Sequence, residues 1–231
     1  MTHPYPFVFL IDVDNTLLDN DEIQQDLMDH LERGFGVAAR ERYVRILDDL
    51  FTELGYRDYL GALQRYRIEH PKTIELASMS FFLMDYPFAN RLLPSALDVI
   101  KHLGSFGPTV ILSDGDVVFQ PHKIEHAGLA RAVDERVLIY IHKEQALDDV
   151  EQRYPSRHYV MVDDKLPLLT AAKQFWGERV TTVLPRQGRY ANDPKLLGAF
   201  PPADVTIERI GELLDWDPFR PGPAAQLVTA V

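Results

Sequence analysis

The chain has 231 residues, of which 46% are hydrophobic and 26% are charged, a composition typical of a soluble globular protein and not of a disordered or fibrous one. Its 24 basic and 35 acidic residues give a formal charge of −11, which disfavours nucleic acid or an anionic membrane as the main partner. The sequence contains no cysteine, so disulfides, thiolate zinc sites and cysteine nucleophiles are excluded.

The N-terminal segment contains a short apolar run that stops at Asp12. No basic stretch precedes it, so we expect neither a signal peptide nor a membrane span, and we expect a cytoplasmic protein. Residues 5–11 are mainly β-branched, aromatic and aliphatic, which predicts a buried strand.

Residues 19–91 show helical periodicity without a convincing strand pattern. Glycine and proline residues interrupt this pattern and separate four predicted helices. The predicted helices cover residues 20–33, 38–54, 58–69 and 73–84.

After Pro94 the predicted helices and strands alternate, which favours βαβ units and a mostly parallel sheet with helices on both faces. The tail from 218 to 231 is rich in proline and alanine and is expected to pack loosely. The predicted helices cover 94–104, 121–127, 143–153, 166–176 and 208–214, and the strands cover 109–112, 137–141, 158–162, 179–184 and 205–207.

Polar side chains follow four of the predicted strands. In open α/β sheets the ligand crevice lies outside the carboxyl ends of the strands, so we expect these side chains to converge although they are far apart in the sequence. They are Asp12-Val13-Asp14-Asn15-Thr16, Ser113-Asp114, Lys143 and Asp163-Asp164.

The four aspartates have the chemistry of a phosphoryl-transfer site. Side chains two apart in an extended segment share a face about 6–7 Å apart, so Asp12 and Asp14 could flank one phosphoryl group. Asp163 and Asp164 would supply oxygen ligands for Mg²⁺. The ion would neutralise charge between an anionic nucleophile and an anionic substrate.

Ser113 and Lys143 complete the pattern. Ser113 offers a hydroxyl to phosphate oxygens, and Lys143 offers a compact positive charge. In isolation, either would be interpreted as a structural residue. A calcium-binding loop is the rival interpretation of DVDNT, but Leu17 and Ile23 stand where such a loop needs glycine and glutamate.

Four segments, FVFLIDVDNTL, TVILSDG, IHKEQAL and YVMVDDK, occur in the order of the four motifs of the haloacid dehalogenase (HAD) superfamily. The chain resembles that superfamily from about residue 5 to residue 190. The resemblance implies a Rossmann-like core formed by residues 1–18 and 92–231, with an all-helical cap formed by residues 19–91 inserted after the first motif.

The resemblance also implies roles for individual residues. Asp12 would attack phosphorus and form an aspartyl phosphate, and Asp14 would first protonate the leaving group and then activate water. The implied phosphate-binding residues are Ser113, Asp114, Lys143 and Asn15, and the implied metal ligands are Asp12, Asp14, Asp164 and, after these, Asp163.

Three positions depart from the usual motifs of the superfamily. Asn15 stands where glycine is common, and asparagine tolerates a left-handed backbone. Lys143 is followed by Glu144 instead of proline, which leaves Lys123 as a reserve candidate for the active-site lysine. Leu168 stands where other members carry a later aspartate.

The sequence therefore predicts a Mg²⁺-dependent phosphatase acting on a small phosphorylated metabolite, and it sets no oligomeric state. The alternatives are a phosphomutase, a dehalogenase, a phosphonatase or a catalytically silent binding module. Asp14 argues against the dehalogenase, because that branch has no acid at this position. Lys72 is the only cap lysine that a phosphonatase could use for its Schiff base, and no motif residue is lost as in a silent module.

Two further patterns occur in the sequence. His122, Glu125 and His126 fit the H-x-x-E-H pattern of some zinc peptidases, but no other feature supports a peptidase. The helical block is rich in arginine, and one or two of these side chains could reach an anionic substrate. The arginines are at positions 33, 40, 42, 45, 57, 65, 67 and 91.

Overall fold

The structure, a computed structural model, describes residues 4–73 and 76–217. Its centre is a six-stranded, entirely parallel sheet in the order β3-β2-β1-β4-β5-β6. The chain builds outward from β1 to β3 and then returns to add β4 on the other side of β1, which creates a switch point there. The strands are β1 Tyr5–Ile11, β2 Thr109–Asp114, β3 Val137–Tyr140, β4 Ser156–Val162, β5 Val180–Pro185 and β6 Val205–Ile207.

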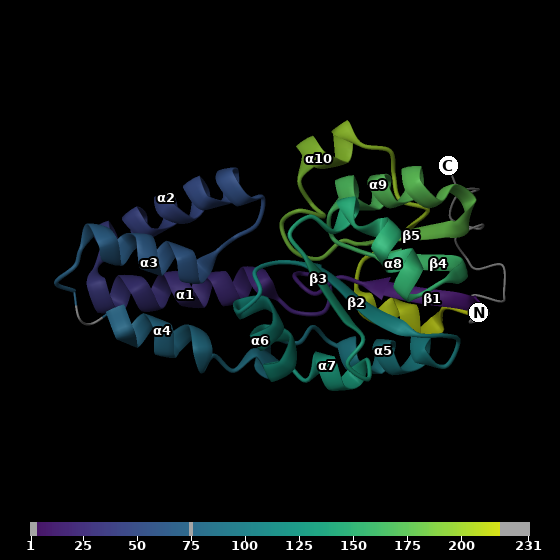
Figure 1. Ribbon diagram of the computed structural model, residues 1–231, viewed down its shortest axis with the longest axis horizontal. Helices are drawn as coiled ribbons and strands as arrows, with labels where there is room; N and C mark the ends of the chain where they lie inside the picture. Colours follow the sequence, from purple (N-terminus) through teal and green to yellow (C-terminus); the bar gives the residue numbers. More distant parts are fainter. Residues whose placement is uncertain (1–3, 74–75, 218–231) are drawn as a thin grey trace.

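Helices cover both faces of this sheet (Figure 1). Alternation along β1 sends Val8 and Leu10 to one face and Phe9 and Ile11 to the other, and all four side chains are fully buried. The Phe9 face packs against α5, α6 and α7, and the Val8 face packs against α8 and α9. These helices are α5 Ala96–Gly104, α6 Phe119–His126, α7 Leu129–Ala132, α8 Leu147–Arg153 and α9 Leu166–Trp176.

Four further helices form a block that extends from one end of the sheet (Figure 1). Asp19 caps α1 by accepting a hydrogen bond from the Glu22 N–H at 3.0 Å. Ile23, Leu27 and Leu31 recur at four-residue spacing and are buried, so α1 presents one apolar stripe to the block. The helices of the block are α1 Asn20–Phe35, α2 Val37–Leu54, α3 Tyr59–Glu69 and α4 Ala77–Met84.

The predicted α/β fold is confirmed, and several element predictions need correction. The helix predicted at 143–153 is two elements, because the Lys143 N–H bonds the Asp114 carboxylate at 2.8 Å and holds the first turn as a 3-10 helix. The helix predicted at 208–214 is also 3-10. Helices α7 and α10 were not predicted. The remaining elements are α10 Pro194–Ala199 and the 3-10 helices η2 Phe88–Arg91, η3 Lys143–Gln145, η4 Gly177–Arg179 and η5 Ile210–Asp215.

The division at residues 18/19 and 91/92 stays a prediction. The tail predicted to pack loosely, residues 218–231, lies outside the described residues. Within the described part of the chain, no helix is long and apolar enough to cross a membrane.

Candidate active site

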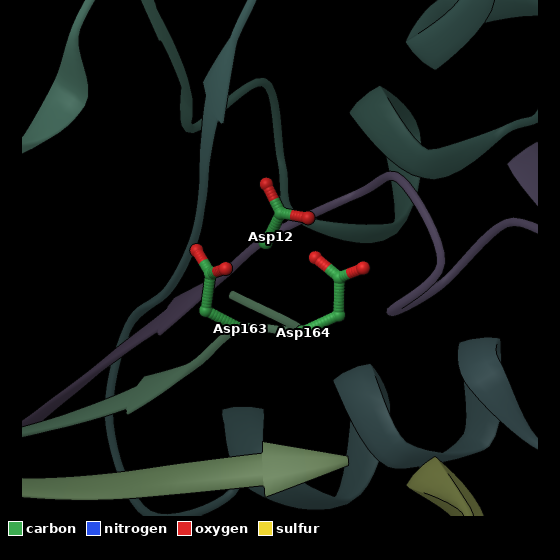
Figure 2. A group of neighbouring side chains, drawn as sticks. All are labelled: Asp12, Asp163 and Asp164. Atoms are coloured by element: carbon green, nitrogen blue, oxygen red, sulfur yellow. The ribbon is translucent and has the colours of Figure 1, made fainter. Parts of the chain in front are cut away.

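Three carboxylates meet at the carboxyl ends of the two central strands. Asp12 follows β1, and Asp163 and Asp164 follow β4, which is hydrogen-bonded to β1. Figure 2 shows the three side chains pointing toward a common space. One oxygen of each lies within 4.8 Å of the others, and this is the only such group of possible metal ligands among the described residues. The adjacent strands thus bring together positions about 150 residues apart, as the sequence predicted.

Lys143 contacts two of these carboxylates and is fully buried. Its Nζ is 2.5 Å from Asp12 Oδ1 and 2.6 Å from Asp163 Oδ2, and it donates to the Leu112 carbonyl at 3.1 Å. Burial opposes the charge, but the neighbouring aspartates hold the pKa of Lys143 well above its usual range. Lys143 is therefore a permanent cation next to the predicted nucleophile.

Asp164 is the carboxylate that this lysine does not neutralise. Both of its oxygens are buried and lack a hydrogen-bond partner. Burial, together with the charges of Asp12 and Asp163, raises the pKa of Asp164 well above its usual range, and burial raises the pKa of Asp163 to about 6. Buried, unpartnered carboxylate oxygens are unfavourable unless a cation or a proton joins them, so this group fits a hard, oxygen-binding metal ion.

Asp14 occupies a different environment from Asp12. Its side chain is 29% exposed, lies outside the group of three carboxylates and pairs with Lys123 Nζ at 2.5 Å. Lys123 is buried and also donates to Asn20 Oδ1 at 3.3 Å. The two candidate lysines, Lys143 and Lys123, thus both lie in the site, where Lys143 pairs with Asp12 and Lys123 pairs with Asp14.

The turn after β1 positions the loop that carries Asp14. Asn15 adopts φ 60°, which confirms that asparagine here provides the left-handed turn. Its side-chain oxygen accepts hydrogen bonds from the backbone N–H groups of Asn20 at 3.0 Å and Asp21 at 3.1 Å. Asn15 therefore ties the loop that carries Asp14 to the start of α1.

Ser113 and Asp114 stand at the end of β2, beside Asp12. Ser113 is buried and its Oγ accepts a hydrogen bond from Gln120 Nε2 at 2.8 Å. Asp114 binds the Lys143 N–H, and burial raises the pKa of its carboxyl group. The structure thus places all the predicted site residues at one edge of the sheet, while their roles stay predictions.

A cavity of about 70 Å³ opens in front of Asp14 and Asp164. The end of α2, the α2–α3 loop and the start of α3 line the cavity through Phe51, Tyr56, Arg57 and Tyr59. Tyr59 is buried where it lines the cavity, and burial, reinforced by the charge of Asp14, raises its pKa to about 12. The volume is far below the roughly 300–1,000 Å³ of pockets for drug-sized ligands.

The same loop touches the sheet end directly. Gly55 ends α2 with φ 82°, and a Cβ placed on it would overlap the imidazole of His142. His142 immediately precedes Lys143. The α2–α3 loop therefore contacts the edge that carries the site, and the positive φ of Gly55 favours glycine at this contact.

Several residues singled out in the sequence lie away from the cavity. His122 Nε2 hydrogen-bonds the Met84 carbonyl at 2.6 Å, and His126 Nδ1 bonds the His122 carbonyl at 2.9 Å. Of the eight arginines of the block, only Arg57 lines the cavity, and Lys72 does not line it.

Sequence reasoning missed Asn20, Gln120 and Tyr59. A signal existed for one face of α6, because Gln120 and Lys123 are three residues apart and share the side of the helix that faces Ser113 and Asp14.

Comparison with known proteins gives one consistent family. The model of the haloacid dehalogenase-like hydrolases matches residues 8–175. A solved structure described as a haloacid dehalogenase-like hydrolase, from Burkholderia xenovorans LB400, is 61% identical, with a TM-score of 0.89, and the match covers 93% of this chain and 100% of that one. No curated protein matches the chain.

More distant structures share the fold. An L-2-haloacid dehalogenase from Xanthobacter autotrophicus is 18% identical with a TM-score of 0.57, covering 91% of this chain and 97% of that one. A HAD-hydrolase from Bacillus subtilis bound to magnesium is 17% identical with a TM-score of 0.60, and the match covers 92% of this chain and 98% of that one.

Proposed function

Because the chain belongs to the haloacid dehalogenase-like hydrolase family, we propose that it is a Mg²⁺-dependent phosphatase that cleaves a small phosphate monoester. The observation that supports this most is the contrast between its two aspartates. Asp12 lies buried against Lys143 and the other carboxylates, whereas Asp14 lines the cavity. This arrangement separates a nucleophile from an acid–base group, and a dehalogenase has no leaving-group oxygen for that acid to protonate.

In the proposed reaction, Asp14 holds a proton when the substrate binds. An Asp12 oxygen attacks phosphorus, the bond from phosphorus to the ester oxygen breaks, and the leaving oxygen takes that proton from Asp14. Asp14 then removes a proton from the water that attacks phosphorus, and the bond between Asp12 and phosphorus breaks. Lys143 and the Ser113 hydroxyl stabilise negative charge on the phosphoryl oxygens. Asp12, Asp163 and Asp164 would hold Mg²⁺, which supplies charge neutralisation between the nucleophile and the phosphate.

The direct test is a panel of phosphate esters with Mg²⁺, using Asp12→Asn as the blank. We expect phosphate release that stops with EDTA and returns with Mg²⁺. Specificity constants should be higher for small sugar or acid phosphates than for phosphopeptides or oligonucleotides, because the cavity is small. Halide release from 2-haloacids without phosphate release from any ester would contradict the proposal.

Metal binding should stabilise the protein in a pH-dependent way. We expect Mg²⁺ to raise the Tm more at pH 7.5 than at pH 5, because the raised pKa values of Asp163 and Asp164 mean that protons compete with the ion as the pH falls through about 6. Thermal melts with and without Mg²⁺ measure this. Equal increments at the two pH values would show that Mg²⁺ binds elsewhere.

A second anionic group on the substrate would bind Arg57. Its guanidinium lines the cavity and pairs with Asp48 at 3.1 Å, and its buried Nε lacks a partner. For the best substrate of the panel, Arg57→Ala should raise KM about 10–100-fold with little change in kcat, the loss expected for one charge-assisted hydrogen bond. Arg40→Ala is the matched control, because Arg40 pairs with Glu32 away from the cavity. Equal KM values for the two variants would remove Arg57 from substrate binding.

A further inference from the structure

Lys123 is a buried cation for which the proposed reaction has no role. It lies on α6 with 1% exposure, three residues after the glutamine that bonds Ser113. Its ammonium lies 6.0 Å from the centre of the Phe119 ring, one helical turn earlier. A lysine is almost never fully buried unless it is paired, so its partners indicate why it is there.

The Lys123 ammonium contacts Asp14 and the first helix of the helical block. Within residues 4–73 and 76–217, Asp14 is the only carboxylate that forms an ion pair with Lys123, whereas Lys143 pairs with Asp12 and Asp163. The second acceptor is the Asn20 side chain, and Asn20 is the first residue of α1. The Lys123 ammonium thus contacts both the partly exposed Asp14 side chain and the first residue of α1, where the helical block begins.

We propose that Lys123 is a positioning residue that acts through Asp14, holding its carboxylate toward the cavity in register with the helical block. This proposal rests on the proposed phosphatase function, because only that function assigns proton transfer to Asp14. Loss of Lys123 should affect the two steps in which Asp14 transfers a proton, and it should leave the attack by Asp12 on an ester with a good leaving group largely intact.

The test uses Lys123→Met, which keeps the length and the contact with Phe119 but removes the charge. With an aryl phosphate and Mg²⁺, rapid-quench measurements should show a burst of phosphorylated Asp12, followed by a steady-state rate lowered about 100-fold, the low end of the range for general acid–base catalysis. Lys123→Arg should restore part of the rate. The double variant Lys123→Met/Asp14→Asn should be no slower than Asp14→Asn alone.

The proposal would be overturned if the double variant lost rate by the product of the two single-variant losses. It would also be overturned if Lys123→Met kept the steady-state rate of the unaltered protein. Lys123→Gln replaces Lys123→Met if the latter does not fold. If the unaltered protein hydrolyses no phosphate ester, the proposed function fails, and crystal structures of the variants still decide the role of Lys123. An Asp14 side chain that keeps its orientation without Lys123 would overturn the proposal, and one that turns away would support it.

Discussion

Asp12→Asn should lower kcat for the best phosphate ester by at least about 10⁴-fold, because an amide cannot replace the carboxylate in covalent catalysis. The fold should tolerate the change, since Lys143 keeps Asp163 as its counter-charge and one negative charge leaves a crowded, buried group. Steady-state kinetics and a thermal melt measure the two effects.

Mass spectrometry of acid-quenched protein provides the complementary evidence. The unaltered enzyme and Asp14→Asn should both carry a phosphoryl group on the peptide that contains Asp12 when an aryl phosphate is the substrate, and Asp12→Asn should carry none. A stable adduct on any other residue would assign the nucleophile elsewhere.

Lys143→Met should destabilise the fold by about 3–5 kcal/mol at pH 7.5, because it leaves buried carboxylates without their cation. The loss should shrink toward pH 5. An aspartate whose folded pKa is raised above its unfolded value binds a proton more readily when folded, so the folded variant gains stability as the pH falls. Urea unfolding at the two pH values measures the difference.

Lys173→Met is the matched control for that experiment. The Lys173 side chain is 35% exposed, pairs with Asp204 at 3.0 Å and should contribute no more than about 1 kcal/mol. Saturating Mg²⁺ should recover part of the stability lost in Lys143→Met, because the ion supplies positive charge to the same carboxylates. Equal losses for the two lysine variants would mean that Lys143 does not balance the charge of the buried group.

The parallel sheet could be predicted because strand and helix patterns alternate clearly after Pro94, and its polar strand ends follow from that alternation. Asp12, Ser113 and Asp163 each directly follow or end a buried apolar run, so their convergence needed only the rule that parallel strands end at one edge. The left-handed turn at Asn15 was similarly readable from the residue type.

The contacts between the helical block and the sheet end could not be predicted. Tyr59 and Arg57 reach the cavity only because the α2–α3 loop lies over the edge of the sheet, and no periodicity encodes that placement. The 3-10 turn at Lys143 likewise depends on a hydrogen bond to Asp114, 29 residues away. Helix α10 did have a local signal, Asp193 followed by Pro194, but it is only six residues long.

The contact between Gly55 and His142 bears on how a substrate enters the site. With the α2–α3 loop seated on the sheet end, the cavity of about 70 Å³ in front of Asp14 and Asp164 is far smaller than a typical ligand pocket. Under the proposed function, the helical block would then move away from the sheet end to admit the ester and again to release the product. If that movement were slower than the proposed transfer of the phosphoryl group, it would set the rate of turnover, and changes to the reactive groups would leave the observed rate unchanged.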